Sequence, residues 1–197
     1  MGRMHSRVAD NPRSGANSGV LVDRDGVLNE DLSFVGTPER LRPIAGADAA
    51  IARLHRAGAL VAVISNQSGV ARGFFDEAAV RATNAHLARL LSREGDPPDA
   101  FYFCPHHPEG TVAAYRTACA CRKPGTLLVE RAIAELGLDR GRTVLVGHTE
   151  SDLACGRSAA LATVAVGPGA RGLEADHSAA DLGDAVAWIV GRITAIG

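Results

Sequence analysis

The sequence predicts an α/β fold built on one parallel β-sheet with helices on both faces. Short apolar runs of five to seven residues alternate along the chain with amphipathic segments of helical period. Within the runs the apolar residues are continuous, as in parallel strands that are buried on both faces. The length of 197 residues suits about one domain. In folds of this kind ligands bind at the carboxyl ends of the strands.

The individual elements follow from this alternation. Gly58 and Gly137 end two of the expected helices, and Asp76 can cap a third. The expected strands are 19–23, 59–65, 100–104, 143–147 and 161–166. The expected helices are 46–57, 77–93, 125–136, 152–160 and 179–194, with an irregular loop over 105–124. We expect 1–18 to be a disordered polar leader and 19–197 to be one domain.

The composition excludes several classes of protein. Basic and acidic residues number 21 and 22, a balance unsuited to strong binding of the nucleic-acid backbone. No stretch approaches the ~18 apolar residues of a membrane span. The polar leader lacks the apolar centre of a signal peptide. We therefore expect a cytoplasmic monomer without a nucleic-acid or membrane partner.

Two carboxylates mark the end of the first expected strand, Asp23 and Asp25. A carboxylate in the crevice can attack phosphorus and form an aspartyl-phosphate. The second carboxylate can protonate the leaving oxygen and then activate water. Mg²⁺ would offset the repulsion between these groups and a phosphate. In isolation the same residues also fit a turn that caps a strand.

Further polar groups follow the other strands. Ser65 and the backbone N–H groups after it suit phosphoryl oxygens, and Lys123 can neutralise charge on a transferring phosphoryl group. Residues 148–152 bring polar and acidic groups to the fourth strand end. Singly, these features also fit polar loops or solvated surface pairs. Together they favour a site for phosphate and a metal ion.

A cluster of cysteines predicts a second metal site. Three of the four cysteines lie within eighteen residues, in a long loop that needs a constraint. The predicted zinc ligands are Cys104, His106, Cys119 and Cys121. His107 competes with His106, but it points the other way in an extended loop. Four protein ligands leave no open position, so the zinc would be structural; buried unpaired cysteines are the alternative. Cys155 is expected in the core.

Four motifs resemble the haloacid dehalogenase (HAD) phosphatases. They are DRDGVLN (23–29), SNQSGVARG (65–73), CPHHPEG (104–110) and CACRKPG (119–125). The similarity runs over about residues 19–167. Its most specific part is the zinc-loop motif. Within the family the motifs are similar to those of phosphatases acting on D-glycero-D-manno-heptose 1,7-bisphosphate, with histidinol-phosphate phosphatases as close relatives.

The resemblance implies a Rossmann-like, HAD-like fold with a minimal cap. Asp23 would be the nucleophile, Asp25 the general acid and base, and Ser65 and Lys123 the groups that stabilise the phosphoryl group. The expected substrate-binding residues are Asp31, Phe34, Ser65, Asn66, Gln67, Ser68, Arg122 and Lys123. Magnesium would involve the Asp23 carboxylate, the Asp25 backbone carbonyl and Asp152. Zinc would take the four ligands named above.

One position departs from the family pattern. The fourth motif has the form GDxxxD, and its first aspartate, which helps bind magnesium, is here His148. Neutral imidazole is a poor ligand for magnesium. Three interpretations remain open. Magnesium binds through water to Glu150 or Asp152, a nitrogen-tolerant metal such as Mn²⁺ is used, or catalysis is weak or lost.

The predicted function is hydrolysis of a sugar phosphate, namely the 7-phosphate of D-glycero-D-manno-heptose 1,7-bisphosphate. A bisphosphate needs a second anion site, for which Arg72 and Arg122 are available. Histidinol-phosphate hydrolysis is the alternative within the same class. A catalytically weakened, zinc-containing binding domain is the alternative from another class. His148 favours this alternative, because it replaces the aspartate that helps bind magnesium.

Overall fold

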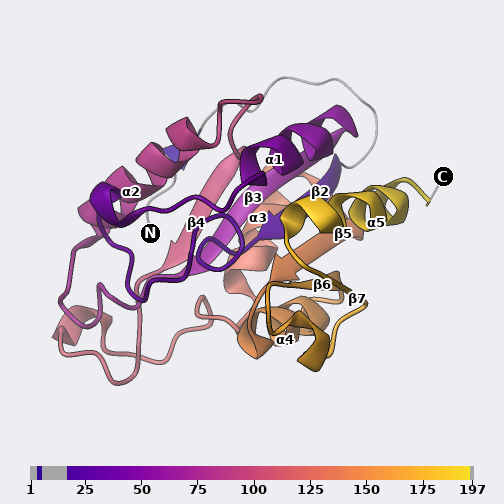
Figure 1. Ribbon diagram of the computed structural model, residues 1–197. Helices are drawn as coiled ribbons and strands as arrows, with labels where there is room; N and C mark the ends of the chain where they lie inside the picture. Colours follow the sequence, from indigo (N-terminus) through magenta and orange to yellow (C-terminus); the bar gives the residue numbers. More distant parts are fainter. Residues whose placement is uncertain (1–3, 6–16, 196–197) are drawn as a thin grey trace.

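The computed structural model of the chain describes residues 4–5 and 17–195 (Figure 1). Its centre is a sheet in the order β1-β4-β3-β2-β5-β6-β7. All neighbouring strands are parallel except β1, which pairs antiparallel with β4. The strands are β1 Met4–His5, β2 Asn17–Val22, β3 Ala59–Asn66, β4 Ala100–Cys104, β5 Leu138–Gly147, β6 Ala162–Val166 and β7 His177–Ala179.

Helices cover both faces of the sheet, which gives three layers. Helices α1, α2 and α5 pack on one face, and α3 and α4 on the other (Figure 1). They span α1 Ala47–Arg56, α2 Glu77–Leu90, α3 Leu127–Leu136, α4 Glu150–Ser158 and α5 Leu182–Thr194. Short 3₁₀ turns lie at Pro38–Arg40, Ala113–Tyr115 and Ala170–Gly172. The predicted fold class is confirmed.

The continuous hydrophobicity of the strands is explained by their burial on both faces. In β2, Val20 and Val22 belong to the core beneath α1 and α5, while Leu21 belongs to the core beneath α3. All three side chains are fully buried. Successive side chains of a strand point to opposite faces, so a strand in a three-layer fold has no polar face.

Several boundaries differ from the prediction. Strand β5 begins at Leu138 rather than 143, because a polar stretch there pairs with β2 across a register shift. Strand β7 ends at Ala179, the first residue of the segment predicted to be the last helix. It was not predicted, because a three-residue edge strand has no apolar run. Helix α5 instead begins after Asp181, whose side chain accepts a hydrogen bond from the backbone of Asp184.

The predicted leader overlaps the sheet at two points. Residues 17–18 belong to β2, and Met4–His5 form the short strand β1. These residues lack the apolar run by which the other strands were predicted. The rest of the leader, 1–3 and 6–16, lies outside the described residues.

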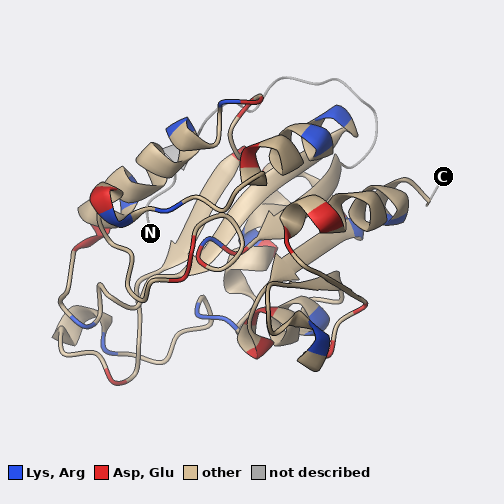
Figure 2. Cartoon of the chain, viewed as in Figure 1, with Lys and Arg blue, Asp and Glu red and all other residues tan. Residues whose placement is uncertain are grey.

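Charged residues of both signs lie on the surface of the described chain. Figure 2 shows Lys and Arg interspersed with Asp and Glu, and neither sign dominates in this view. Among the described residues, no helix has both the length and the apolarity that crossing a membrane requires.

Candidate active site

The carboxyl ends of three adjacent strands, β3, β2 and β5, meet at one cavity of about 250 Å³. The loops that follow these strands supply most of its wall. The lining residues are Asp23, Asp25, Asp31, Ser33, Phe34, Ser65, Asn66, Gln67, Ser68, Gly69, Lys123, His148, Thr149, Ser151 and Asp152. The fold thus brings together segments more than 120 residues apart in the sequence.

Lys123 is the central cation of the cavity. Its Nζ lies 2.9 Å from Asp23 Oδ1 and 2.8 Å from Asp152 Oδ1, and it donates to the carbonyl of Ile64 at 2.9 Å. Burial disfavours its charged form, but the two carboxylates outweigh burial and raise the pKa of Lys123. The two carboxylates thus favour the charged form of the ammonium group that lies beside Asp23.

The loop that carries Lys123 is tied directly to the end of β3. The backbone N–H of Lys123 donates to Asn66 Oδ1 at 3.0 Å, and Asn66 Nδ2 donates back to the Lys123 carbonyl at 3.2 Å. This reciprocal pair fixes a residue of an irregular loop against a rigid strand end. Asn66 thus has a structural contact besides its place in the cavity wall.

Asp25 is held by a buried arginine between the two aspartates. Arg24 is fully buried; its Nε and Nη2 atoms lie 2.8–3.2 Å from the Asp25 carboxylate. Its other donors reach Asn84 Oδ1 of α2 and the carbonyl of Val35. A fork of this kind sets the orientation as well as the position of a carboxylate.

Gln67 extends this network to Ser65. Gln67 Oε1 accepts from Arg24 at 3.1 Å, which fixes its amide so that Nε2 donates to Ser65 Oγ at 2.6 Å and to Asp25 Oδ2 at 3.2 Å. Because Ser65 Oγ already accepts a hydrogen bond, its own hydrogen is free for an acceptor elsewhere. A phosphoryl oxygen in the cavity is such an acceptor.

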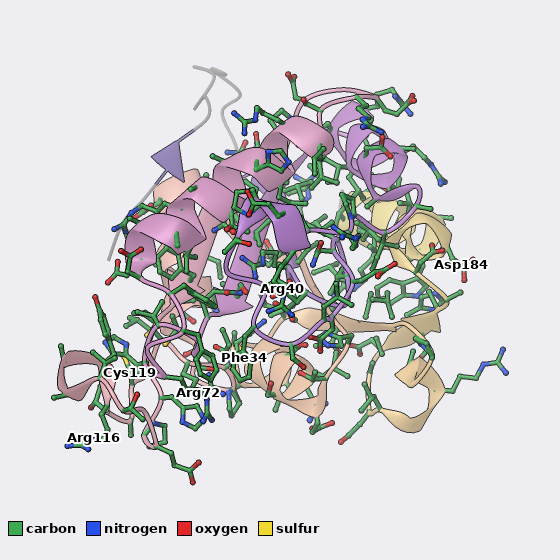
Figure 3. The ribbon with its side chains drawn as sticks, turned by 60° about the vertical axis from the view of Figure 1, so that its left-hand side comes forward. Phe34, Arg40, Arg72, Arg116, Cys119 and Asp184 are labelled. Carbon is green, nitrogen blue, oxygen red and sulfur yellow. The ribbon has the colours of Figure 1, made fainter. Side chains whose placement is uncertain are left out.

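The loop at the cavity mouth has a strained backbone held by one guanidinium group. Ser33 and Phe34 both have positive φ angles, 54° and 52°. Arg40 donates to the carbonyls of Leu32, Ser33 and Phe34 at 2.9–3.2 Å. Figure 3 shows Phe34 between Arg40 and Arg72. Arg72 lies 5.7 Å over the Phe34 ring, so the mouth has an aromatic wall backed by cations.

Arg122 is the one expected substrate-binding residue that does not line this cavity. Its Nη1 and the Nε of Arg72 are both shielded from solvent and have no hydrogen-bond partner. Burial and the nearby Arg72 lower the pKa of Arg122. Two neighbouring cations with unsatisfied N–H groups suit an anion, and His107 lies 3.3 Å from Arg72 Nη2.

His148 and Asp152 complete the cavity beyond β5. Asp152 Oδ2 accepts from the backbone N–H groups of His148 and Thr149 and from Thr149 Oγ1 at 2.8–3.1 Å, and together with Thr149 it forms a capping box at the start of α4. Lys123 lowers the pKa of Asp152 although burial opposes that shift. His148 Nδ1 lies 3.4 Å from Asp23 Oδ2, and its interaction with Asp23 raises the pKa of His148.

These residues form the carboxylate site, defined as Asp23, His148 and Asp152. One ligand atom from each lies within 4.8 Å of the others. The shielded His148 Nδ1 has no hydrogen-bond partner. A ring nitrogen at ion-pair distance from two carboxylates, without a hydrogen bond to either, fits a divalent cation. The donor set contains nitrogen, unlike the oxygen sets that magnesium prefers.

The cysteine cluster, defined as Cys104, His106, Cys119 and Cys121, lies where β4 runs into the long loop. Its four ligand atoms also lie within 4.8 Å of one another. Cys121 Sγ lies 2.6 Å from Cys104 Sγ and 3.0 Å from Cys119 Sγ, and His106 Nδ1 is 3.4 Å from Cys121 Sγ. The hydrogen bond from Cys121 lowers the pKa of Cys104 to about 6. Three sulfurs and one imidazole fit tetrahedral zinc.

Sequence reasoning missed the residues that position the site. Arg24 and Asn84 were not expected to contribute, although an arginine between two acidic residues is a signal that could have been used. Arg40 gave no signal, because its contacts depend on the loop conformation. Cys155 is buried in the core as predicted, and burial raises its pKa to about 11.

The fold and the cavity define a HAD-like phosphatase: an aspartate pair follows β2, a serine hydroxyl group lies at the end of β3, and a lysine reaches the first aspartate. A family described as "HAD-hyrolase-like" matches residues 120–191.

Relatives narrow this class. The chain is 43% identical over 142 residues to D-glycero-beta-D-manno-heptose-1,7-bisphosphate 7-phosphatase of Rhodopseudomonas palustris, covering 72% of this chain and 79% of that one. It is 38% identical to D-glycero-D-manno-heptose-1,7-bisphosphate 7-phosphatase of Thermosynechococcus vestitus, covering 86% and 94%. The chain belongs to the family of the D-glycero-D-manno-heptose-1,7-bisphosphate 7-phosphatases.

A solved structure agrees with this assignment. The D,D-heptose 1,7-bisphosphate phosphatase of B. bronchiseptica, complexed with magnesium and phosphate, is 32% identical and superposes with a TM-score of 0.78. The match covers 88% of this chain and 98% of that one.

Proposed function

We propose that the protein hydrolyses the 7-phosphate of D-glycero-D-manno-heptose 1,7-bisphosphate through an aspartyl-phosphate. The observation that carries the proposal is the convergence of Asp23, Asp25 and Lys123 on one cavity. The printed activity of the relatives supplies the substrate. Asp23, Asp25, Ser65 and Lys123 are the proposed catalytic residues.

In the first half-reaction a carboxylate oxygen of Asp23 attacks phosphorus. The P–O bond to the sugar breaks, and its electron pair stays on the sugar oxygen, which takes the proton from the protonated Asp25 carboxyl. The sugar leaves as an alcohol, and phosphate remains as an acyl phosphate on Asp23. The fork from Arg24 keeps Asp25 oriented for this transfer.

In the second half-reaction the Asp25 carboxylate takes a proton from water. The water oxygen attacks phosphorus, the bond to Asp23 breaks, and inorganic phosphate is released. Asp23 regains its carboxylate and Asp25 its proton, so the enzyme is ready for another cycle. Lys123 and the Ser65 hydroxyl group offset the charge on the phosphoryl oxygens in both halves.

Two metal ions are part of the proposal. A divalent cation, Mg²⁺ or Mn²⁺, would be held by the Asp23 carboxylate and the Asp25 backbone carbonyl, with His148 and Asp152 adjacent. It would supply positive charge that draws the phosphate to two carboxylates. Zn²⁺ would bind the cysteine cluster and constrain the long loop.

The remaining expected contacts concern substrate recognition. Asp31, Phe34 and Gln67 lie in the cavity wall and Ser68 beside them, where they would contact the sugar. The unsatisfied N–H groups of Arg72 and Arg122 support binding of the second phosphate. A substrate with two phosphates uses this feature, whereas histidinol phosphate, with one, does not.

We also propose that the enzyme works as a cytoplasmic monomer. None of the four cysteines, all of which are described, forms a disulfide bond, as is usual in a reducing compartment. The mixed surface charge is ordinary for a soluble small-molecule enzyme.

A phosphate-release panel tests the function. The kcat/KM of the wild-type protein for phosphate release should be higher with the heptose 1,7-bisphosphate than with histidinol phosphate or p-nitrophenyl phosphate. Each substrate is measured with Mg²⁺ and with Mn²⁺. A preference for histidinol phosphate would reassign the substrate, and the absence of release from all three would refute the proposal.

A further inference from the structure

His148 has two ring nitrogens in different surroundings. Nε2 lies 3.5 Å from Asp31 Oδ2. Nδ1 faces Asp23 Oδ2 at 3.4 Å and Asp152 Oδ2 at 3.6 Å. This nitrogen is shielded from solvent and makes no hydrogen bond. The ring therefore points one nitrogen at an outer carboxylate and the other into the carboxylate site.

This arrangement resembles that of a metal-binding histidine, with Nε2 and Asp31 Oδ2 at an ion-pair distance of 3.5 Å. Such a histidine donates its second ring N–H to a carboxylate, which fixes the tautomer and the orientation of the ring. With the hydrogen on Nε2 facing Asp31, the lone pair of Nδ1 faces two carboxylates. A lone pair and two negative oxygens repel one another unless a positive charge lies between them, and that charge is either a proton on Nδ1, as in an ion pair with Asp23, or a bound metal ion.

We propose that His148 binds the catalytic divalent cation through Nδ1, and that the site selects Mn²⁺ or a similar first-row transition ion over Mg²⁺. Asp31 orients the ring in this arrangement. The inference rests on the proposed function only in that it concerns the cation of the same site.

The neighbouring groups favour His148 over Asp152 as the ligand. Asp152 Oδ2 already accepts three hydrogen bonds, and Oδ1 pairs with Lys123. Asp152 is thus occupied in holding the strand end. Gly26 packs against the His148 ring, where any side chain would collide with it, so the local backbone leaves the imidazole room.

Donor chemistry sets the metal preference. Mg²⁺ demands oxygen ligands and retains its waters, whereas imidazole nitrogen suits later divalent ions. An imidazole in place of a carboxylate also removes one negative charge, which weakens binding of a hard ion more than that of a softer one.

The test measures metal binding directly in the zinc-loaded protein, without substrate. Pulsed EPR of bound Mn²⁺ should show coupling to a ¹⁴N nucleus, and His148→Asp should abolish that coupling. Calorimetric titration should show the ratio of Mn²⁺ to Mg²⁺ affinity falling about tenfold in His148→Asp. Asp31→Asn should weaken Mn²⁺ binding by about 10- to 100-fold, as loss of an orienting carboxylate usually does.

Glu150→Gln is the matched control, because Glu150 is an exposed acid two residues after His148, at the start of α4, and it pairs with Arg157. It should leave Mn²⁺ affinity unchanged; a loss would mean that the metal binds through Glu150 and would overturn the proposal. Absence of ¹⁴N coupling, or of Mn²⁺ binding, in the wild-type protein would also overturn it, whether or not any variant folds. Nitrogen coupling without phosphate release would refute the proposed function and leave the ligand assignment intact.

Discussion

The cysteine cluster and the carboxylate site both collect candidate metal ligands, but they differ in donors and surroundings. The cysteine cluster has three sulfurs and one nitrogen and lies between β4 and an irregular loop. The carboxylate site has oxygens and one nitrogen and borders an open cavity. In Figure 3 Cys119 lies on the outlying loop, apart from Phe34 in the cavity wall.

Because of this difference, we expect the cysteine cluster to affect the stability of the fold and the carboxylate site to affect phosphate hydrolysis. A closed set of four ligands leaves no place for substrate, so its metal can stabilise the loop but cannot act on a phosphate. A partial set beside a cavity can act on substrate, but the crowding of Asp23, Asp152 and Lys123 costs desolvation energy. Variants at one site should therefore affect a property that variants at the other leave unchanged.

The largest effect is expected from Asp23→Asn. An amide cannot attack phosphorus, so kcat should fall by roughly 10⁴-fold, as for removal of other catalytic nucleophiles. Phosphate release in single-turnover and steady-state assays measures this loss. Melting temperature and zinc content should not fall. Asp48→Asn, in α1 and away from the cavity, serves as control, and a retained wild-type rate in Asp23→Asn would disprove the nucleophile.

The converse effect is expected from Cys121→Ser. Removing a zinc ligand should lower the zinc content from one per chain toward zero and the melting temperature by on the order of 10 °C. Calorimetry and metal analysis measure both. Protein that remains folded at low temperature should keep a kcat close to wild type.

Cys155→Ser is the control for the cysteine cluster, since Cys155 is buried on α4 and is not one of the clustered ligands. It should leave the zinc content unchanged. If Cys121→Ser kept a full complement of zinc, the cysteine cluster would not be the zinc site.

A smaller effect on chemistry is expected from Gln67→Glu. The substitution keeps the shape and the acceptor for Arg24 but removes the donor to Ser65 and places a negative charge beside Asp25. Loss of one such hydrogen bond, worth about 1.4 kcal/mol, corresponds to a tenfold fall in kcat. Steady-state kinetics should show this fall in kcat, with a smaller rise in KM from the altered contact with the sugar. A change confined to KM would show that Gln67 contacts the sugar without positioning Ser65.

The smallest effect is expected from Arg40→Gln. Arg40 is exposed and supports the strained loop at the cavity mouth, so its loss should raise KM for a sugar phosphate roughly fivefold, the equivalent of about 1 kcal/mol. The kcat for p-nitrophenyl phosphate should not change. Arg53→Gln, which changes an exposed arginine of α1, should alter neither this KM nor this kcat. If Arg40→Gln raised KM equally for both substrates, a role of Arg40 in sugar recognition would be contradicted.

Much of the fold could be predicted because its strands are buried on both faces. The predicted ends of β3 and β4 agree with the structure to within one residue. A continuous apolar run is stable only where both faces of a strand are buried, so its ends mark the ends of the strand. The short edge strand β7 and the polar start of β5 could not, because their pairing depends on a neighbour rather than on their own residues. The same holds for Met4–His5.

The sequence by itself determined the chemistry available to the protein. Three of its features are local patterns: the spacing of Asp23 and Asp25, the position of Lys123 near the end of a long loop, and the grouping of cysteines. Local patterns can be recognised in the sequence alone. Only the tertiary structure decided how these groups are held. Arg24 reaches Gln67, and His148 turns one nitrogen toward Asp23, because packing brings segments that are distant in the sequence into contact. A contact between segments far apart in the chain depends on distance and orientation, which no linear spacing encodes.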